Sequence, residues 1–183
     1  MIKKTFISLL RGINVGGKKS IKMDRLQKSF EELGLENVRT YVQSGNVIFM
    51  VPKISAEALS QRIREKILAD FGVSVSVLLL SSEELKNTVK NNPFLTEKGI
   101  DASKLHVTFL SETPNKAAIM ELETKSAEPD KFRYCKNRIY IYCPNGYGRT
   151  KLSNNAIEKM LSVTATTRNW KTVNELYRIS STI

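Results

Sequence analysis

The sequence predicts an α+β fold of two ferredoxin-like βαββαβ halves in a pseudo-repeat, each an antiparallel sheet with helices mainly on one face. Two observations carry this prediction. Apolar runs of strand length and amphipathic stretches of helix length follow one another in the same order in both halves, although the residues themselves do not repeat. The 183 residues are 41% apolar and 26% charged, an ordinary globular composition that can fill one good core or two small ones.

Residues that begin and end helices mark the elements of the first half. Apolar residues recur at helical spacing after residue 22, and Gly34 ends that helix. Ser55 caps a second helix, and Ser81 with Glu84 forms a capping-box pattern for a third. We therefore expect, in order, a strand at 5–11, a helix at 23–33, a hairpin at 37–51, a helix at 55–71, a strand at 73–80 and a helix at 81–91.

The second half shows the same order of elements. Thr113 and Pro114 mark the start of its first helix. The polar segment 92–103 suits a linker, which predicts domains at 1–91 and 104–183. The elements expected here are a strand at 105–110, a helix from 113, a hairpin at 131–143, a helix at 154–161, a strand at 164–169 and a helix at 170–179.

The opening strand ends at Arg11 and continues into a glycine-rich loop that carries lysines. Glycines let the backbone turn several N–H groups toward one point, which makes an anion nest, and the next helix adds its positive N-terminal end. In a βαββαβ sheet the turn between the second and third strands lies at the same end. We expect an anion-binding site here, the first basic corner, made of Arg11, Gly12, Asn14, Gly16, Gly17, Lys18, Lys19, Lys22, Gln43, Ser44 and Asn46. The alternative is a glycine-rich turn whose lysines are merely solvated.

The same loop differs from the nucleotide-binding P-loop. Gly12, Gly17 and Lys18 match the P-loop spacing, but Lys19 stands where a Ser or Thr would hold Mg²⁺. The apolar strands of this half also lack the terminal Asp that completes such a metal site. The sequence therefore disfavours an NTPase.

A second set of cations is expected in the second half. The segment 144–151 follows the third strand of that half and 167–171 follows the fourth, and these two strand exits lie together in the predicted topology. We hypothesise that the two corners face each other across a cleft. The second basic corner consists of Arg149, Lys151, Arg168, Asn169 and Trp170.

Residues suited to nucleophilic, metal or redox chemistry are few. His106 lies within an alternating strand, where packing is the more common role of a histidine. No metal-ligand spacing occurs, so we expect no metal and no cofactor, and catalytic residues stay unknown. Cys135 and Cys143 do not face each other in the predicted hairpin and are expected to be reduced. Because no apolar run suits a signal peptide or a membrane span, we expect a cytoplasmic protein without membrane contact.

The charge balance suggests a class of partner. Lysine and arginine outnumber aspartate and glutamate by 29 to 18, and the net charge of +11 favours polyanions. The leading hypothesis is a non-enzymatic binding module for nucleic acid or another polyanion. The alternative is a small enzyme that acts on a phosphorylated or carboxylated metabolite in the cleft, with Arg11 and Arg168 clamping this small anionic ligand. Composition does not decide between them.

Several motifs resemble a bacterial family known as domain of unknown function 1697. The likeness covers nearly the whole chain and implies an α+β architecture of ferredoxin-like elements, but no activity. Its recurrent motifs fall on residues of both basic corners. The motifs are LLRGINVGGKKSIKM at 9–23, TYVQSGNVIF at 40–49, NPF at 92–94, GRTKLSN at 148–154 and TTRNWKTV at 166–173.

Overall fold

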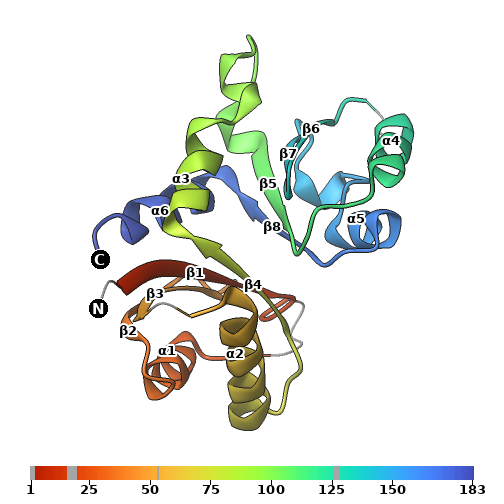
Figure 1. Cartoon of the computed structure of the whole chain (residues 1–183). Helices are drawn as coiled ribbons and strands as arrows, with labels where there is room; N and C mark the ends of the chain where they lie inside the picture. Colours follow the sequence, from red (N-terminus) through yellow and green to blue (C-terminus); the bar gives the residue numbers. More distant parts are fainter. Residues whose placement is uncertain (1–2, 16–19, 53, 126–127) are drawn as a thin grey trace. The chain divides into compact units, whose positions relative to one another are not determined.

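The computed structural model describes residues 3–15, 20–52, 54–125 and 128–183. It holds two separate four-stranded antiparallel sheets, one from each half of the chain (Figure 1). The strand at 105–110 pairs within the second sheet and not with the opening strand. The predicted α+β fold of two βαββαβ halves is therefore confirmed.

Contacts between residues divide the chain into two compact units. The first unit comprises residues 1–88 and 175–183, and the second comprises residues 89–174. The segment 92–103, predicted to be a linker, lies in the second unit and contains two short 3-10 helices. The predicted division into domains at 1–91 and 104–183 stays a prediction.

The first unit is built on a sheet with the strand order β2-β3-β1-β4. Helices α1 and α2 lie together on one face of this sheet (Figure 1). Buried apolar side chains between the sheet and these helices form the core, among them Leu10, Phe30, Phe49 and Ile63. The elements are β1 (Lys3–Arg11), α1 (Met23–Glu32), β2 (Glu36–Tyr41), β3 (Asn46–Pro52), α2 (Ala56–Phe71), β4 (Ser76–Ser81) and α3 (Ser82–Lys90).

The predicted helix termini of this unit are confirmed. Oγ of Ser55 accepts a hydrogen bond from the N–H of Ala58 at 3.2 Å, and Gly72 ends the same helix in the left-handed conformation with φ of 65°. The N–H of Ser81 donates to Oε2 of Glu84 at 2.8 Å, and the N–H of Glu84 donates back to Oγ of Ser81 at 3.2 Å. Each of these signals acts over a few neighbouring residues, so the sequence suffices to predict it.

The second unit is built on a sheet with the strand order β6-β7-β5-β8. Its core lies between this sheet and helices α4 and α5 and contains Leu122, Ile139, Ile141 and Ile157. The elements that follow α3 in the chain are η1 (Pro93–Thr96), η2 (Ala102–Lys104), β5 (Leu105–Leu110), α4 (Lys116–Lys125), β6 (Lys131–Cys135), β7 (Arg138–Tyr142), η3 (Tyr147–Arg149), α5 (Asn154–Leu161), β8 (Ala165–Asn169) and α6 (Trp170–Ser180). Helix α6 begins in the second unit, and its residues from 175 onward belong to the first.

Helix α4 begins later than the sequence signals indicate. The prediction placed its start at Thr113 and Pro114, whereas the helix begins at Lys116. The side chain of Asn115 accepts a hydrogen bond from the N–H of Ala117 at 2.8 Å. Because asparagine caps helices better than threonine, the cap moves to Asn115 and the helix starts after it.

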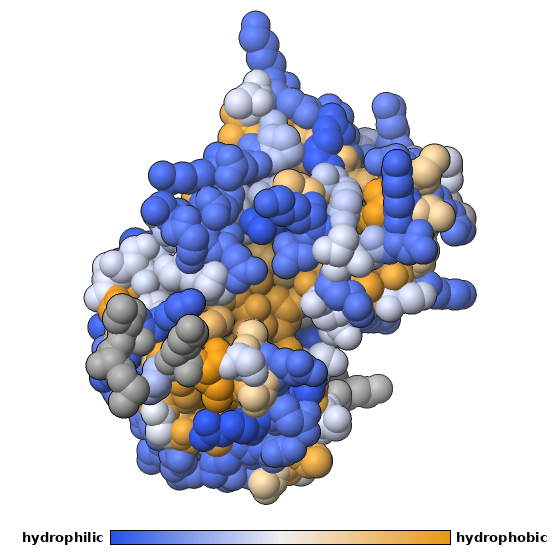
Figure 2. Space-filling model, in the orientation of Figure 1, coloured by the Kyte–Doolittle hydropathy of each residue, from blue (hydrophilic) through white to orange (hydrophobic). Residues whose placement is uncertain are grey.

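Hydrophilic side chains cover most of the face of the molecule drawn in Figure 2. This agrees with an ordinary globular composition in which 26% of the residues are charged. Over the described residues, no helix combines the length and the apolar character needed to cross a membrane.

Candidate functional site

The end of β1 and the turn between β2 and β3 lie together, as the topology predicts. The backbone N–H of Leu10 donates to the carbonyl of Gly45 at 2.9 Å. Nδ2 of Asn14 donates to the carbonyl of Gln43 at 2.8 Å. Both bonds join the two loops of the first basic corner directly.

Two asparagine side chains of this corner brace its backbone. Oδ1 of Asn14 accepts from the N–H of Ile21 at 2.7 Å, and Nδ2 donates to the carbonyl of Ile21 at 2.9 Å, so the two ends of the loop are clamped together. Asn46 is fully buried, and its Nδ2 donates to the carbonyl of Tyr41 at 2.9 Å. With the bond to Gln43, Asn14 commits both amide protons to the fold.

Gly45 packs too closely against its neighbours to carry a side chain. Its φ is +71°, and a Cβ atom there would lie 2.8 Å from Cβ of Leu10 and 2.7 Å from Cδ1 of Ile13. Gly12 has nearly the same φ, +72°, but a Cβ atom there would meet nothing within 4 Å. The close approach of the two loops therefore depends on Gly45.

The remaining residues of the first basic corner differ in exposure. Arg11 is half-buried at the end of β1, whereas Lys22 is exposed immediately before α1. Gln43 is exposed and Ser44 is half-buried. Outside the described residues lie Gly16, Gly17, Lys18 and Lys19. Anion binding at this corner stays a prediction.

The segments that follow β7 and β8 also meet, as predicted. His106, near the start of β5, pairs with Asn169 at the end of β8. The hydroxyl of Tyr147 in η3 donates to Oγ1 of Thr167 in β8 at 2.9 Å. Within the second unit, the segment that follows β7 therefore contacts the end of β8 at the second basic corner.

Three of the five residues predicted for this corner have structural roles. Arg168 is buried and lies on the face of the sheet opposite to Thr167, because successive strand residues alternate. Oδ1 of Asn169 accepts from the N–H of Thr172 at 2.8 Å and so caps α6. Trp170 is the buried first residue of that helix.

Arg149 and Lys151 remain at the surface of the second basic corner. Both side chains are exposed. Neither makes a hydrogen bond or ion pair through its side chain within the described part of the chain. These two cations are therefore able to contact an anionic ligand without first breaking such a bond.

Beside these cations, polar side chains form a connected group that we name the polar cluster. The ring of His106 stacks on the ring of Tyr147, with centroids 4.8 Å apart and planes 27° apart. Oγ1 of Thr167 donates to Oδ1 of Asn154 at 2.7 Å. Because a hydroxyl has one proton, the Oγ1 atom of Thr108, 2.6 Å away, must donate to Thr167. The polar cluster consists of His106, Thr108, Tyr147, Asn154 and Thr167.

These hydrogen bonds orient two polar groups that are not themselves paired. A carbonyl oxygen only accepts, so Nδ1 of His106, 3.1 Å from the carbonyl of Lys104, carries the proton and Nε2 of the neutral ring keeps its lone pair. Since Oδ1 of Asn154 accepts from Thr167, its Nδ2 amide is directed away from that hydroxyl. Over the described residues, neither Nε2 nor Nδ2 has a hydrogen-bond partner.

Burial keeps His106 neutral. It lowers the pKa of the imidazole below the ordinary value of 6.5, and the hydrogen bond with the carbonyl of Lys104 offsets only part of this shift. At pH 7 the ring is therefore uncharged, and Nε2 can accept a hydrogen bond but cannot donate one.

The cysteines show no sign of shared chemistry. Both are free thiols, with Cys135 exposed and Cys143 buried. Burial raises the pKa of the Cys143 thiol to about 11. In the portion of the chain that the structure describes, no three His, Cys, Asp or Glu side chains gather as a metal site would require.

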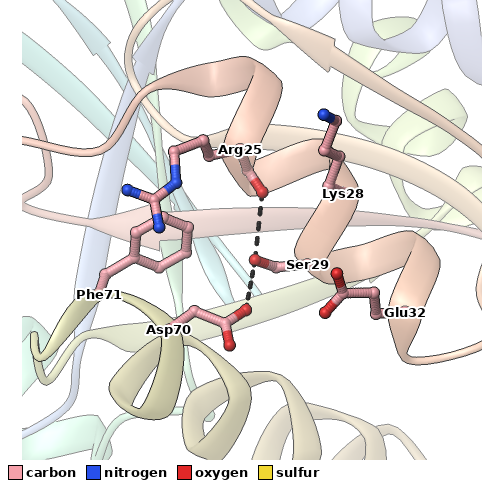
Figure 3. Close-up of a pocket in the computed structure, with 6 residues that line it drawn as sticks. All are labelled: Arg25, Lys28, Ser29, Glu32, Asp70 and Phe71. Carbon is pink, nitrogen blue, oxygen red and sulfur yellow. Dashed lines mark hydrogen bonds between the residues drawn. The ribbon is translucent and has the colours of Figure 1, made fainter.

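A shallow pocket of about 230 Å³ lies between α1 and α2 (Figure 3). Oγ of Ser29 donates to Oδ2 of Asp70 at 2.5 Å, and Nζ of Lys66 donates to Oδ1 at 3.0 Å. These bonds, that from Ser29 first, hold the pKa of Asp70 below its usual value. The bond from Ser29 joins α1 to α2, and the carboxylate of Asp70 is already paired. The lining of the pocket consists of Arg25, Lys28, Ser29, Glu32, Asp70 and Phe71.

Comparison with known proteins agrees with the fold. A model of the family described as Protein of unknown function (DUF1697) matches residues 3–140. The chain belongs to this family. The solved structure of the conserved bacterial protein SP0830 from Streptococcus pneumoniae is similar, with a TM-score of 0.76 and 22% identity, covering 98% of this chain and 99% of that one. At that identity the likeness shows the fold alone. No curated protein matches the chain.

One motif of the resemblance to the DUF1697 family, NPF at 92–94, has a structural explanation here. Oδ1 of Asn92 accepts from the N–H of Phe94 at 3.1 Å and caps η1. The buried Phe94 ring lies 6.3 Å from the Tyr142 ring, and the guanidinium of Arg133 lies over it at 5.3 Å. The motif therefore anchors η1 to the second sheet.

The polar cluster was missed by sequence reasoning, which assigned His106 to packing. His106 is the second residue of β5 and so lies at the end of the strand, where the neighbouring loops meet. That position could have been inferred from the predicted topology. The stacking on Tyr147 could not, because it depends on how η3 folds back onto the sheet.

Proposed function

We propose that this member of the DUF1697 family is a binding module for nucleic acid or another polyanion, with Arg149 and Lys151 contacting phosphates. The observation that carries the proposal is the pair of exposed cations beside an oriented polar cluster at one loop junction. Such cations release counterions from a polyanion when they bind it.

The overall charge supports the same partner. A net charge of +11 draws acidic macromolecules toward the protein at long range. Lys22, exposed at the first basic corner, adds a further cation beside the loop between β1 and α1. Proteins of this kind bind a backbone by charge and gain selectivity from aromatic and polar groups nearby.

The experiment is a salt titration of binding to a fluorescent single-stranded oligonucleotide, followed by anisotropy. For single strands the logarithm of the affinity falls with the logarithm of salt concentration by about 0.7 per phosphate contact. Replacing Arg149 and Lys151 by Ala together should weaken binding and reduce that slope by roughly 1.4. The matched control replaces Lys98 and Lys116, two exposed lysines of the same unit outside the corner, and should leave the slope near that of the wild type.

The competing function is a small enzyme acting on a phosphorylated or carboxylated metabolite. The neutral Nε2 of His106 favours it, since such a nitrogen can act as a general base. This function predicts weak oligonucleotide binding, a shallow salt dependence and a raised melting temperature with the metabolite. A steep salt slope that the double Ala variant reduces would count against it.

A further inference from the structure

We infer that the polar cluster reads the edge of an unstacked nucleobase, with Nε2 of His106 accepting and Nδ2 of Asn154 donating a hydrogen bond. The inference rests on the proposed function and narrows its ligand to single-stranded nucleic acid. Sequence recognition of single strands commonly uses hydrogen bonds to the edges of splayed-out bases together with aromatic and histidine rings.

The first step is that the two groups are held in fixed positions. The ring of His106 is fixed by the stacked Tyr147 and by the carbonyl of Lys104. The amide of Asn154 is fixed by the hydroxyl of Thr167, which also receives the hydroxyl of Tyr147. Tyr147 therefore links the acceptor to the donor through one short chain of contacts.

The second step is that the unprotonated Nε2 of His106, an acceptor in the same cluster as the Asn154 donor, does not suit a phosphate. Phosphate oxygens accept hydrogen bonds, and an unprotonated Nε2 has no proton to give them. The Watson–Crick edge of every nucleobase, in contrast, offers a donor and an acceptor close together, and this edge is exposed when the base is unstacked. The exposed Arg149 and Lys151 supply the donors that phosphates need, so the corner holds both kinds of contact.

The third step is that these two groups can still form hydrogen bonds with a ligand, because the fold does not use them. Asn14, at the other corner, uses both amide protons within the fold. The Nδ2 of Asn154 and the Nε2 of His106 have no partner over the described residues, although both lie in a cluster whose other polar atoms are paired. Polar groups oriented in this way and left unpaired are what a recognition site requires.

The test compares one short oligonucleotide with an otherwise identical strand that is abasic over its central positions. The wild type should prefer the base-bearing strand by between about 5-fold and about 150-fold, the range for a well-placed pair of base contacts. The variant His106→Phe keeps an aromatic ring against Tyr147 but has no acceptor. Its affinity for the base-bearing strand should therefore fall close to its affinity for the abasic strand. The salt slope should stay unchanged, because the cations are intact.

A second arm uses pH. Protonating His106 removes the acceptor but adds positive charge, so the base preference should fall as the pH drops below the lowered pKa of the imidazole, while attraction to the abasic strand stays level or rises. The ring faces the ring of Tyr147 and the backbone carbonyl of Lys104, and the carbonyl does not titrate. His106→Phe should show no such fall.

The outcomes separate the two proposals. Equal wild-type affinity for both strands, or an undiminished preference in folded His106→Phe, overturns base reading alone and leaves polyanion binding standing. Absence of binding to either strand overturns both. If His106→Phe does not fold, His106→Leu, which also lacks an acceptor, replaces it, and an undiminished base preference in that folded variant overturns base reading in the same way.

Discussion

Replacing Gly45 by Ala should destabilise the first unit strongly. The new Cβ would lie 2.8 Å from Cβ of Leu10, which is fixed to the backbone of β1, and 2.7 Å from the end of the Ile13 side chain. Ile13 can move aside, but Leu10 cannot move without shifting the strand. Overpacking of this kind costs about 1–3 kcal/mol, and the left-handed backbone adds roughly 1 kcal/mol for a residue with a Cβ.

Gly12→Ala is the matched control. Its φ of +72° is nearly that of Gly45, but a Cβ there meets nothing within 4 Å, so only the backbone term of roughly 1 kcal/mol applies. Urea denaturation of both variants measures the two free energies of unfolding. We expect Gly45→Ala to lose about 1–3 kcal/mol more than Gly12→Ala. Equal losses would show that close packing of the two loops does not decide the stability of this corner.

Three further predictions test the side chains. Asn14→Ala removes three hydrogen bonds and should lower the free energy of unfolding by about 2–4 kcal/mol in urea denaturation, whereas a loss under 0.5 kcal/mol would contradict its role as a brace. A thiol reagent should modify Cys135 rapidly and Cys143 only after unfolding, because the second thiol is buried and has a pKa of about 11, and equal rates in the native protein would refute this. Because the pKa of His106 is lower in the folded state, the unfolded state binds its proton more readily, so the melting temperature should fall as the pH drops below about 6.5, and His106→Phe should flatten that fall.

The elements and their order could be predicted because their signals are local. Periodicity identified the strands and helices, and Ser81 with Glu84 formed the capping box that the spacing indicated. Where two local signals competed, the prediction was wrong: Thr113 and Pro114 suggested the start of α4, but Asn115 is the cap. Both sheets followed once the elements were known, since few topologies connect them without crossings.

The roles of single polar side chains could not be predicted in the same way, because they depend on contacts between distant segments. Asn14 looked like a ligand donor in a glycine-rich loop, but its partners are Ile21 and Gln43. Arg168 looked like a surface cation beside Asn169, but strand alternation turns it to the buried face. A motif gives the residue types at a corner, and the fold decides which of their hydrogen bonds are used internally.

This difference in use separates the two corners of the molecule. At the first corner, the side chains of Asn14 and Asn46 use their hydrogen bonds to hold two loops together. Replacing either residue should therefore lower the free energy of unfolding. At the second corner, the hydroxyl of Thr167 bonds to Tyr147 and to Asn154. These contacts, with the stacking of Tyr147 on His106, orient two groups that the fold does not use, the imidazole Nε2 of His106 and the amide of Asn154. Keeping an oriented acceptor and donor open at a loop junction contributes no internal hydrogen bond to stability, and it is explained if a ligand supplies the missing partners.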